Sequence, residues 1–236
     1  GGNDLEWATP VLFSRSEDNR LFELAPEDTS SGGKVAPPPL PMPPPETMNF
    51  VGRKQELTYY ATSLAADHVA VIAGMPGVGK TAIAAKLARQ TAKSHDRIFW
   101  HQFHEGEGIE TIIWRLAGML YRHGQRALWE LLEGVRQGKG QPPPTEVLLD
   151  HLIQQLRGQH YTICLDDFHH AEEDPLVDKA VDRLRGLLAS GAVDLIVTSR
   201  RMPRSLKVLS FVPLGGLSLD EASDLLETHR VVLAPD

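Results

Sequence analysis

The segment that most constrains this chain is residues 74–81, GMPGVGKT, which fits the phosphate-binding pattern G-x-x-x-x-G-K-[ST] at every fixed position. The apolar run at 68–73 precedes it and predicts a buried strand, and the alanine-rich run at 82–90 follows it and predicts a helix. In such a strand–loop–helix unit, the loop N–H groups and the positive end of the helix dipole surround one anion. The sequence therefore predicts a P-loop that binds the phosphates of a nucleotide.

The predicted contacts with ATP or ADP lie in this loop and at the start of the helix. Lys80 is expected to reach the outer phosphates, and the Thr81 hydroxyl is expected to bind Mg²⁺. The loop glycines allow the backbone to turn its N–H groups inward. The predicted nucleotide contacts of this region are Gly74, Met75, Pro76, Gly77, Val78, Gly79, Lys80, Thr81 and Ala82.

A second apolar run, at 161–165, ends in the two carboxylates Asp166 and Asp167. A strand this apolar is typical of a parallel sheet covered on both faces, and its end emerges where open α/β sheets bind ligands. Asp166 is expected to orient Mg²⁺ through the waters of the ion, and Asp167 is expected to polarise the attacking water. The alternative interpretation is a pair of solvated turn acids. Cys164, within the strand, is expected to face the core.

Composition and charge argue against several classes of protein. The 236 residues suffice for one large α/β domain or two small ones. The net charge of −7 argues against a domain that grips nucleic acid or an anionic membrane. One cysteine cannot form an internal disulfide, no apolar run reaches the ~18 residues of a membrane span, and the N-terminus lacks a signal-peptide pattern. We therefore expect a cytoplasmic protein without direct nucleic-acid or membrane contact.

The sequence divides into three parts. Residues 1–25 contain two short apolar runs around Asp18-Asn19 and predict a hairpin. Residues 26–47 are rich in proline, serine and glycine and predict a stiff polyproline II linker, with a spacer favoured over a docking peptide for a proline-binding module. Residues 48–236 form the predicted nucleotide-binding domain, in which apolar periodicity over 108–157 predicts helices, the last capped by Thr145.

Other segments resemble the STAND class of P-loop ATPases, which includes the NB-ARC and NACHT switches. The segment FVGRKQEL at 50–57 resembles the VGR-x-x-E-L motif of that class, which implies that Val51, Gly52 and Arg53 lie along the adenine. The FWHQF run at 99–103 is similar to the second strand of bacterial NB-ARC proteins. Its His101 and the nearby His104 lack the partner spacing of a metal site and are interpreted as ordinary polar residues at a strand end.

The C-terminal half carries two more motifs of that resemblance. The TSR segment that ends in Arg200 resembles the sensor strand of the class, which implies that Arg200 senses the γ-phosphate, with Arg201 as second choice. The LGGLSLDEA segment is similar to the step from the last strand into a helix, with Ser218 as its cap. The resemblance also implies that the sensor strand lies between the P-loop strand and the Asp166 strand. The helical lid and winged-helix domain of the class are expected to lie outside this chain.

These motifs predict a three-layer α/β P-loop fold with a central parallel sheet, and Lys80, Asp167 and Arg200 as catalytic residues. The resemblance implies a Mg-ATP/ADP-binding switch whose slow hydrolysis controls an attached effector, with self-association of the full-length protein in the ATP state. The N-terminal WATPVLF…RLF wording resembles the end of caspase-like CHAT domains. Two alternatives remain open at this point: a regulatory module of a transcription activator, and an AAA-like remodelling motor, for which no arginine finger is identified.

Overall fold

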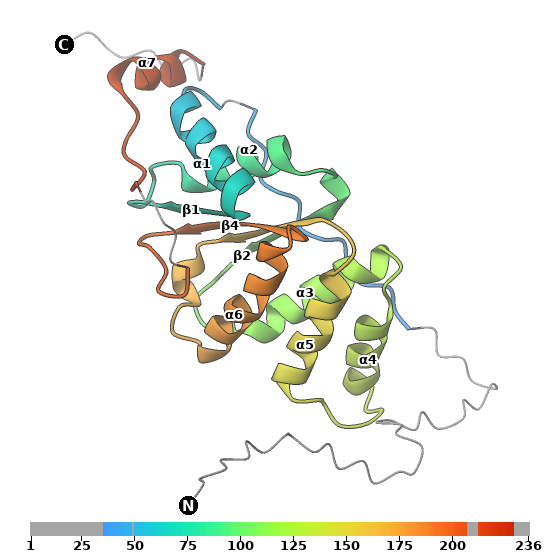
Figure 1. Cartoon of the computed structure of the whole chain (residues 1–236). Coiled ribbons are helices and arrows are strands. Elements are labelled where there is room, and N and C mark those ends of the chain that lie inside the picture. The colour runs from blue at the N-terminus through green and yellow to red at the C-terminus, as the bar shows by residue number, and fades with distance from the viewer. Residues whose placement is uncertain (1–34, 49, 207–211, 229–236) are drawn as a thin grey trace, which may run out of the picture. The chain divides into compact units, whose positions relative to one another are not determined.

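The computed structural model describes residues 35–48, 50–206 and 212–228 (Figure 1). The chain divides into two compact units, residues 1–34 and residues 35–236, and the described segments all belong to the second. The predicted hairpin at 3–25 lies outside the described residues, as does the first part of the predicted linker.

The centre of this unit is a parallel sheet of four strands in the order β1-β4-β3-β2. Because β4 lies between β1 and β3, the strand order implied by the resemblance is confirmed. After β4 the chain returns to the open edge of β1, where Leu214 forms an isolated parallel bridge with Gly74. The strands are β1 (Val69–Ala73), β2 (Ile98–Gln102), β3 (Tyr161–Asp166) and β4 (Val193–Ser199).

Helices cover both faces of the sheet, which confirms the predicted three-layer α/β fold (Figure 1). On one face lie α1 (Lys54–Asp67) and α2 (Lys80–Thr91). On the other lie α3 (Ile109–Arg122), α5 (Thr145–Leu156) and α6 (Pro175–Ala189), with α4 (Ala127–Arg136) packed on α3 and α5. The remaining elements are α7 (Leu219–Thr228) and the short 3-10 turns η1 (His95–Arg97) and η2 (Phe168–His170).

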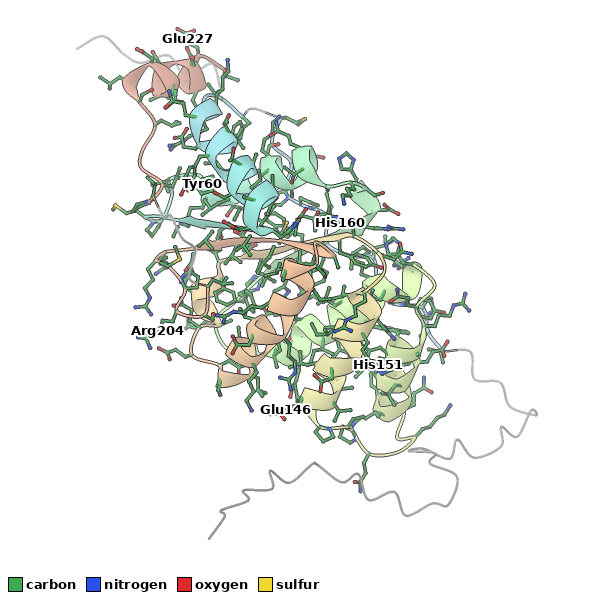
Figure 2. All side chains as sticks on the ribbon, viewed as in Figure 1. Tyr60, Glu146, His151, His160, Arg204 and Glu227 are labelled. Atoms are coloured by element: carbon green, nitrogen blue, oxygen red, sulfur yellow. The ribbon has the colours of Figure 1, made fainter. Side chains whose placement is uncertain are left out.

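Alternation along the strands divides the core into two clusters. In β1, Val69 and Val71 pack with α3, α5 and α6, whereas Ala70 and Ile72 pack under α1 and α2. Tyr60 of α1, labelled in Figure 2, is buried in the second cluster. All residues of β3 and β4 are buried, as expected for central parallel strands. The sheet is therefore a rigid platform whose carboxyl edge carries the site.

Two helix starts differ from the sequence interpretation. Thr145 is the first residue of α5 and not its cap, since Pro144 holds the cap position and no side chain caps this end. Helix α6 was not predicted, because its charged residues obscure the apolar face. It begins after Asp174, whose side chain accepts a hydrogen bond from the Leu176 N–H at 2.9 Å. Among the described residues, no helix combines the length and apolarity needed to cross a membrane.

Candidate nucleotide-binding site

The phosphate loop runs from the end of β1 to the start of α2, as predicted. Gly77 and Gly79 have φ values of +80° and +94°, so side chains there would strain the backbone. A Cβ atom at either position would meet nothing within 4 Å, so the space above the loop is open. The first turn of α2 carries no acidic residue and its N-cap makes no side-chain bond. Its N–H groups are therefore available to an anion.

Lys80 crosses this loop from the first position of α2. Its Nζ atom donates a hydrogen bond of 3.0 Å to the Met75 carbonyl, and the residue is 7% exposed. Met75 lies at the opposite, exposed side of the loop. The ammonium group is therefore held over the loop opening, where the outer phosphates of a nucleotide bind in P-loop proteins.

Asp166 ends β3 directly behind Thr81. The Thr81 hydroxyl lies 3.0 Å and 3.1 Å from the two carboxylate oxygens of Asp166, which is 1% exposed. Burial raises the pKa of Asp166 above its ordinary value, while hydrogen bonds from Thr198 and Thr81 act in the opposite direction. A buried carboxylate next to a threonine hydroxyl fits Mg²⁺, which takes few protein oxygens and keeps several waters.

Asp167 occupies the next position with an unusual backbone. Its φ of 53° places it in the left-handed region, which is uncommon for a residue other than glycine. Two bonds fix it there: its N–H donates to the Thr198 hydroxyl at 2.9 Å, and its Oδ2 atom accepts from Gln102 Nε2 at 3.1 Å. The side chain retains 30% exposure, so water reaches the carboxylate that sequence analysis assigned to water activation.

Three residues of this site were missed by sequence reasoning. Thr198 joins both acids, Gln102 holds Asp167, and His169 places Nδ1 4.0 Å from Asp167 Oδ1. Both ring nitrogens of His169 are buried without a hydrogen-bond partner in the described structure. Burial, then the neighbouring His170 and Arg200, lowers the pKa of His169. Gln102 is the last residue of β2 and Thr198 the last but one of β4, the two strands beside β3. The predicted order of the P-loop, sensor and Asp166 strands therefore contained the signal that would have found Thr198.

The two arginines after β4 have different surroundings. Arg201 forms an ion pair with Glu172, at 3.3 Å between Nε and Oε2. Arg200 is exposed, and its charge acts on His169 at the site. Arg200 therefore lies close enough to His169 to affect its pKa, while the expected contact of Arg200 with a γ-phosphate stays a prediction.

The turn at 51–53 joins three segments through Arg53, which is 4% exposed. Its Nη2 atom donates to the Val78 carbonyl of the phosphate loop at 3.2 Å and to the Gly215 carbonyl at 2.8 Å. Its backbone N–H donates to Glu221 Oε1 at 2.7 Å. Glycine is favoured at position 52 because its φ is +68°, and an added Cβ, 2.4 Å from that same oxygen, would also displace the Glu221 side chain.

Glu221 belongs to a capping box at the start of α7. The Ser218 N–H donates to Glu221 Oε2 at 3.0 Å, and the Glu221 N–H donates to Ser218 Oγ at 3.3 Å. The expectation that Ser218 caps this helix is confirmed. The hydrogen bond from the Arg53 N–H is the largest cause of a lowered pKa at Glu221. The 51–53 turn, the phosphate loop and α7 therefore form one connected unit.

No cluster of three or more His, Cys, Asp or Glu suited to a metal occurs in the described segments, and the interpretation of His101 and His104 as ordinary polar residues stays a prediction. His101 is fully buried, and its Nδ1 accepts from Arg115 Nη1 at 3.1 Å. Burial, followed by the charge of Arg115, lowers the pKa of His101 to about 4. Cys164 is buried as expected, and burial raises the pKa of its thiol.

The parallel sheet, the glycine loop and the acids behind it define a P-loop ATPase domain of the AAA type. The family model for the AAA domain matches residues 65–201, more than half of the chain, and the chain belongs to this family. No curated protein matches the chain. Neither the NB-ARC resemblance nor the CHAT resemblance is reproduced by these comparisons, so both remain expectations.

A solved structure with a similar fold is that of the Aeropyrum pernix ORC1 protein in complex with DNA. The TM-score is 0.54 at 18% sequence identity, and the match covers 77% of this chain. It covers 50% of the ORC1 chain, so the present chain spans about half of that length. At this identity the likeness supports the fold alone.

Proposed function

We propose that this AAA domain binds Mg-ATP and Mg-ADP and hydrolyses ATP slowly, as the nucleotide switch of a STAND-class signalling ATPase. The observation that carries the ATPase assignment is the Thr81 hydroxyl 3.0 Å from buried Asp166, beside an open glycine loop. These residue types and this geometry fit a magnesium nucleotide. The bound Mg²⁺ would neutralise charge on the transferred phosphoryl group.

The residues of this chain divide the work around the nucleotide. The loop N–H groups and Lys80 would hold the phosphates, and Thr81 and Asp166 would hold the ion. Asp167 would accept a proton from, or orient, the attacking water, because its carboxylate is partly exposed and its direction is fixed by Gln102 and Thr198. Arg200 would contribute positive charge near the γ-phosphate.

The switch part of the proposal is supported by Arg53. This single side chain bonds the Val78 carbonyl in the phosphate loop and the Gly215 carbonyl in the segment leading to α7. A change of the loop on hydrolysis would therefore alter the hydrogen bonds that hold the segment leading to α7, and so the position of α7. Such a device suits a protein whose nucleotide state controls an effector.

A second candidate is an AAA-like remodelling or DNA-associated ATPase, which the family match and the ORC1 fold favour. The ORC1 structure contains DNA, but the net charge of −7 here argues against direct DNA contact by this chain. The absence of such contact stays a prediction. A binding assay with duplex DNA at low salt tests it.

The deciding experiment identifies the nucleotide carried by the purified protein, then measures phosphate release and light scattering in Mg-ATP. The switch assignment expects bound ADP, turnover below ~1 s⁻¹, under the usual kinase range, and a monomer for this chain. Turnover of several per second or a stable ATP-dependent ring would instead establish a motor. Absence of any ATP or ADP binding would contradict both.

A further inference from the structure

The proline-rich segment at 35–45 is held against the domain by side chains from three helices. Each of these side chains donates to a backbone carbonyl of the segment. The bonds are Trp129 Nε1 to the Ala36 carbonyl at 2.9 Å, Arg122 Nη2 to Pro38 at 2.5 Å, Arg89 Nη2 to Pro44 at 2.5 Å and Arg89 Nη1 to Pro45 at 2.6 Å. The described part of the predicted spacer is therefore docked, and the compact unit begins at Val35.

This pattern of donors matches the chemistry of a polyproline segment. Proline has no N–H, so its carbonyl is the polar group that it offers to a partner. A polyproline II chain makes no internal hydrogen bonds and leaves these carbonyls free to accept. Indole and guanidinium groups supply donors together with flat apolar faces, as in the aromatic grooves that recognise such chains.

The surface under the first half of the segment is shaped for a proline ring. Trp129 and Trp114 pack edge to face with ring centroids 5.4 Å apart. Gly118 of α3 lies beside them, and a Cβ atom added there would come 3.0 Å from the Cβ of Pro38, which is buried. Glycine within a helix costs about 1 kcal/mol relative to alanine, so Gly118 is explained by the room it leaves for Pro38.

The middle of the segment spans a hollow between its two anchors. Residues 39–42 and α3 enclose a pocket of about 280 Å³ whose other lining residues include Phe99, Trp100, Trp114 and Trp129. Leu40 above it is 82% exposed. Contact is therefore concentrated at the Ala36–Pro38 end, against α3 and α4, and at the Pro44–Pro45 end, against α2.

We propose that α2, α3 and α4 form a polyproline-binding groove whose occupant is residues 36–45 of the same chain, held as a strap. The four hydrogen bonds to the carbonyls of this segment identify it as the occupant. The strap is followed within a few residues by Phe50 and α1, which belong to the domain. The covalent connection therefore gives the strap a high effective concentration at the groove. The N-terminal anchor of the strap, Ala36, therefore lies against α4. This inference is independent of the nucleotide assignment.

A spin label on the strap measures docking in the full chain. Ala36 is exposed while its carbonyl is bonded, so Ala36→Cys places a label at the anchor without removing a contact. The single native cysteine, Cys164, is buried and will not react under native conditions. A docked strap gives an immobilised spectrum, and a freely tumbling spectrum in the otherwise unaltered chain would overturn the proposal.

Two changes should release the label, each by a different route. Gly118→Leu fills the place of Pro38, and its matched control is Gly186→Leu on α6, where an added Cβ meets nothing within 4 Å. Replacement of Pro37, Pro38 and Pro39 by alanine changes only the strap and leaves every side chain of the groove unaltered. Because it removes the preorganisation of three prolines, it should lower the docked-to-free ratio about tenfold or more.

The outcomes separate the possibilities. Release by Gly118→Leu and by the triple alanine change, with none by Gly186→Leu, supports the groove. An unchanged spectrum in the triple alanine variant would overturn polyproline recognition, even if Gly118→Leu failed to fold. Dipolar coupling between labels in a protein dimer would show that a second copy supplies the strap, and would overturn the assignment in cis.

Discussion

The Thr198 hydroxyl donates a hydrogen bond of 2.5 Å to Asp166 Oδ1 across two neighbouring strands of the sheet. The same hydroxyl accepts the N–H of Asp167 at 2.9 Å. One side chain from β4 therefore fixes both the acid assigned to the metal and the acid assigned to water.

Thr198→Val keeps the shape of this side chain but removes its hydroxyl. We expect a loss of about 1–3 kcal/mol in the free energy of unfolding, because a buried carboxylate oxygen and a backbone N–H lose their partner. ATP hydrolysis should fall more than ATP binding, since the direction of Asp167 is no longer fixed. Urea unfolding and phosphate release measure the two effects. Thr62→Val, at an exposed position of α1, is the control, and equal loss in both variants would contradict the role of Thr198.

Lys80→Ala removes the ammonium group over the loop but leaves the backbone N–H groups in place. We expect ATP and ADP affinity to fall at least tenfold, about 1.4 kcal/mol, because charge-assisted hydrogen bonds exceed neutral ones. Calorimetric titration measures this. Lys139→Ala, in the exposed loop after α4, controls for the general loss of one positive charge. Unchanged affinity in Lys80→Ala would rule out the loop as the nucleotide site.

Variants of Asp166 and Asp167 should show different defects in nucleotide binding and in ATP hydrolysis. Asp167→Asn is expected to keep Mg-ATP binding and lose hydrolysis, since the amide keeps the shape but is a poor base. Asp166→Asn is expected to weaken the Mg²⁺ dependence of nucleotide binding, because the negative charge that orients the waters of the ion is lost. Titrations with and without Mg²⁺, together with turnover, test both variants. Equal defects of both variants in both assays would show that the roles are misassigned.

His101 predicts a pH dependence of stability that does not involve the nucleotide. Its pKa falls from 6.5 to about 4 in the fold, so the unfolded chain binds more protons between these values. Above pH 6.5 the histidine is neutral in both states and its burial does not oppose folding. As pH falls toward 4 the unfolded chain takes up the proton first, so the free energy of unfolding decreases. Between pH 7 and 5 this loss is ~2 kcal/mol.

Urea unfolding at the two pH values measures this loss. In His101→Gln the difference between pH 7 and pH 5 should shrink by about that amount. Part of the slope should remain, because burial also lowers the pKa values of His160 and His169. His151→Gln on α5 controls for the general loss of a histidine (Figure 2). A slope that is identical in His101→Gln and in the unaltered protein would contradict the prediction.

The sequence was sufficient for the parts of this fold that follow local rules. The loop glycines, the β-branched strands and the acids at the end of β3 each belong to a pattern only a few residues long, so their positions were predicted. The roles of Thr198 and Gln102 were not predicted, because they depend on contacts with β3, which is distant from both residues in the sequence. Docking of the strap was not predicted for a different reason. A proline run has no hydrophobic periodicity that would indicate a buried face, and its partners Arg89, Arg122 and Trp129 lie on three separate helices.

The close approach of Gly74 and Leu214 has a mechanical consequence. A Cβ atom at Gly74 would lie 2.6 Å from the Leu214 carbonyl oxygen, and the Leu214 N–H donates to Ala73 at 2.7 Å. The segment leading to α7 is thus hydrogen-bonded to Ala73, the last residue of β1, and lies in close contact with Gly74, the first residue of the phosphate loop. Tension applied at α7 would therefore reach the phosphate loop by two routes, through the Leu214 backbone and through the bonds of Arg53. The loop is placed to respond to force at the C-terminal side as directly as it would respond to a change of nucleotide.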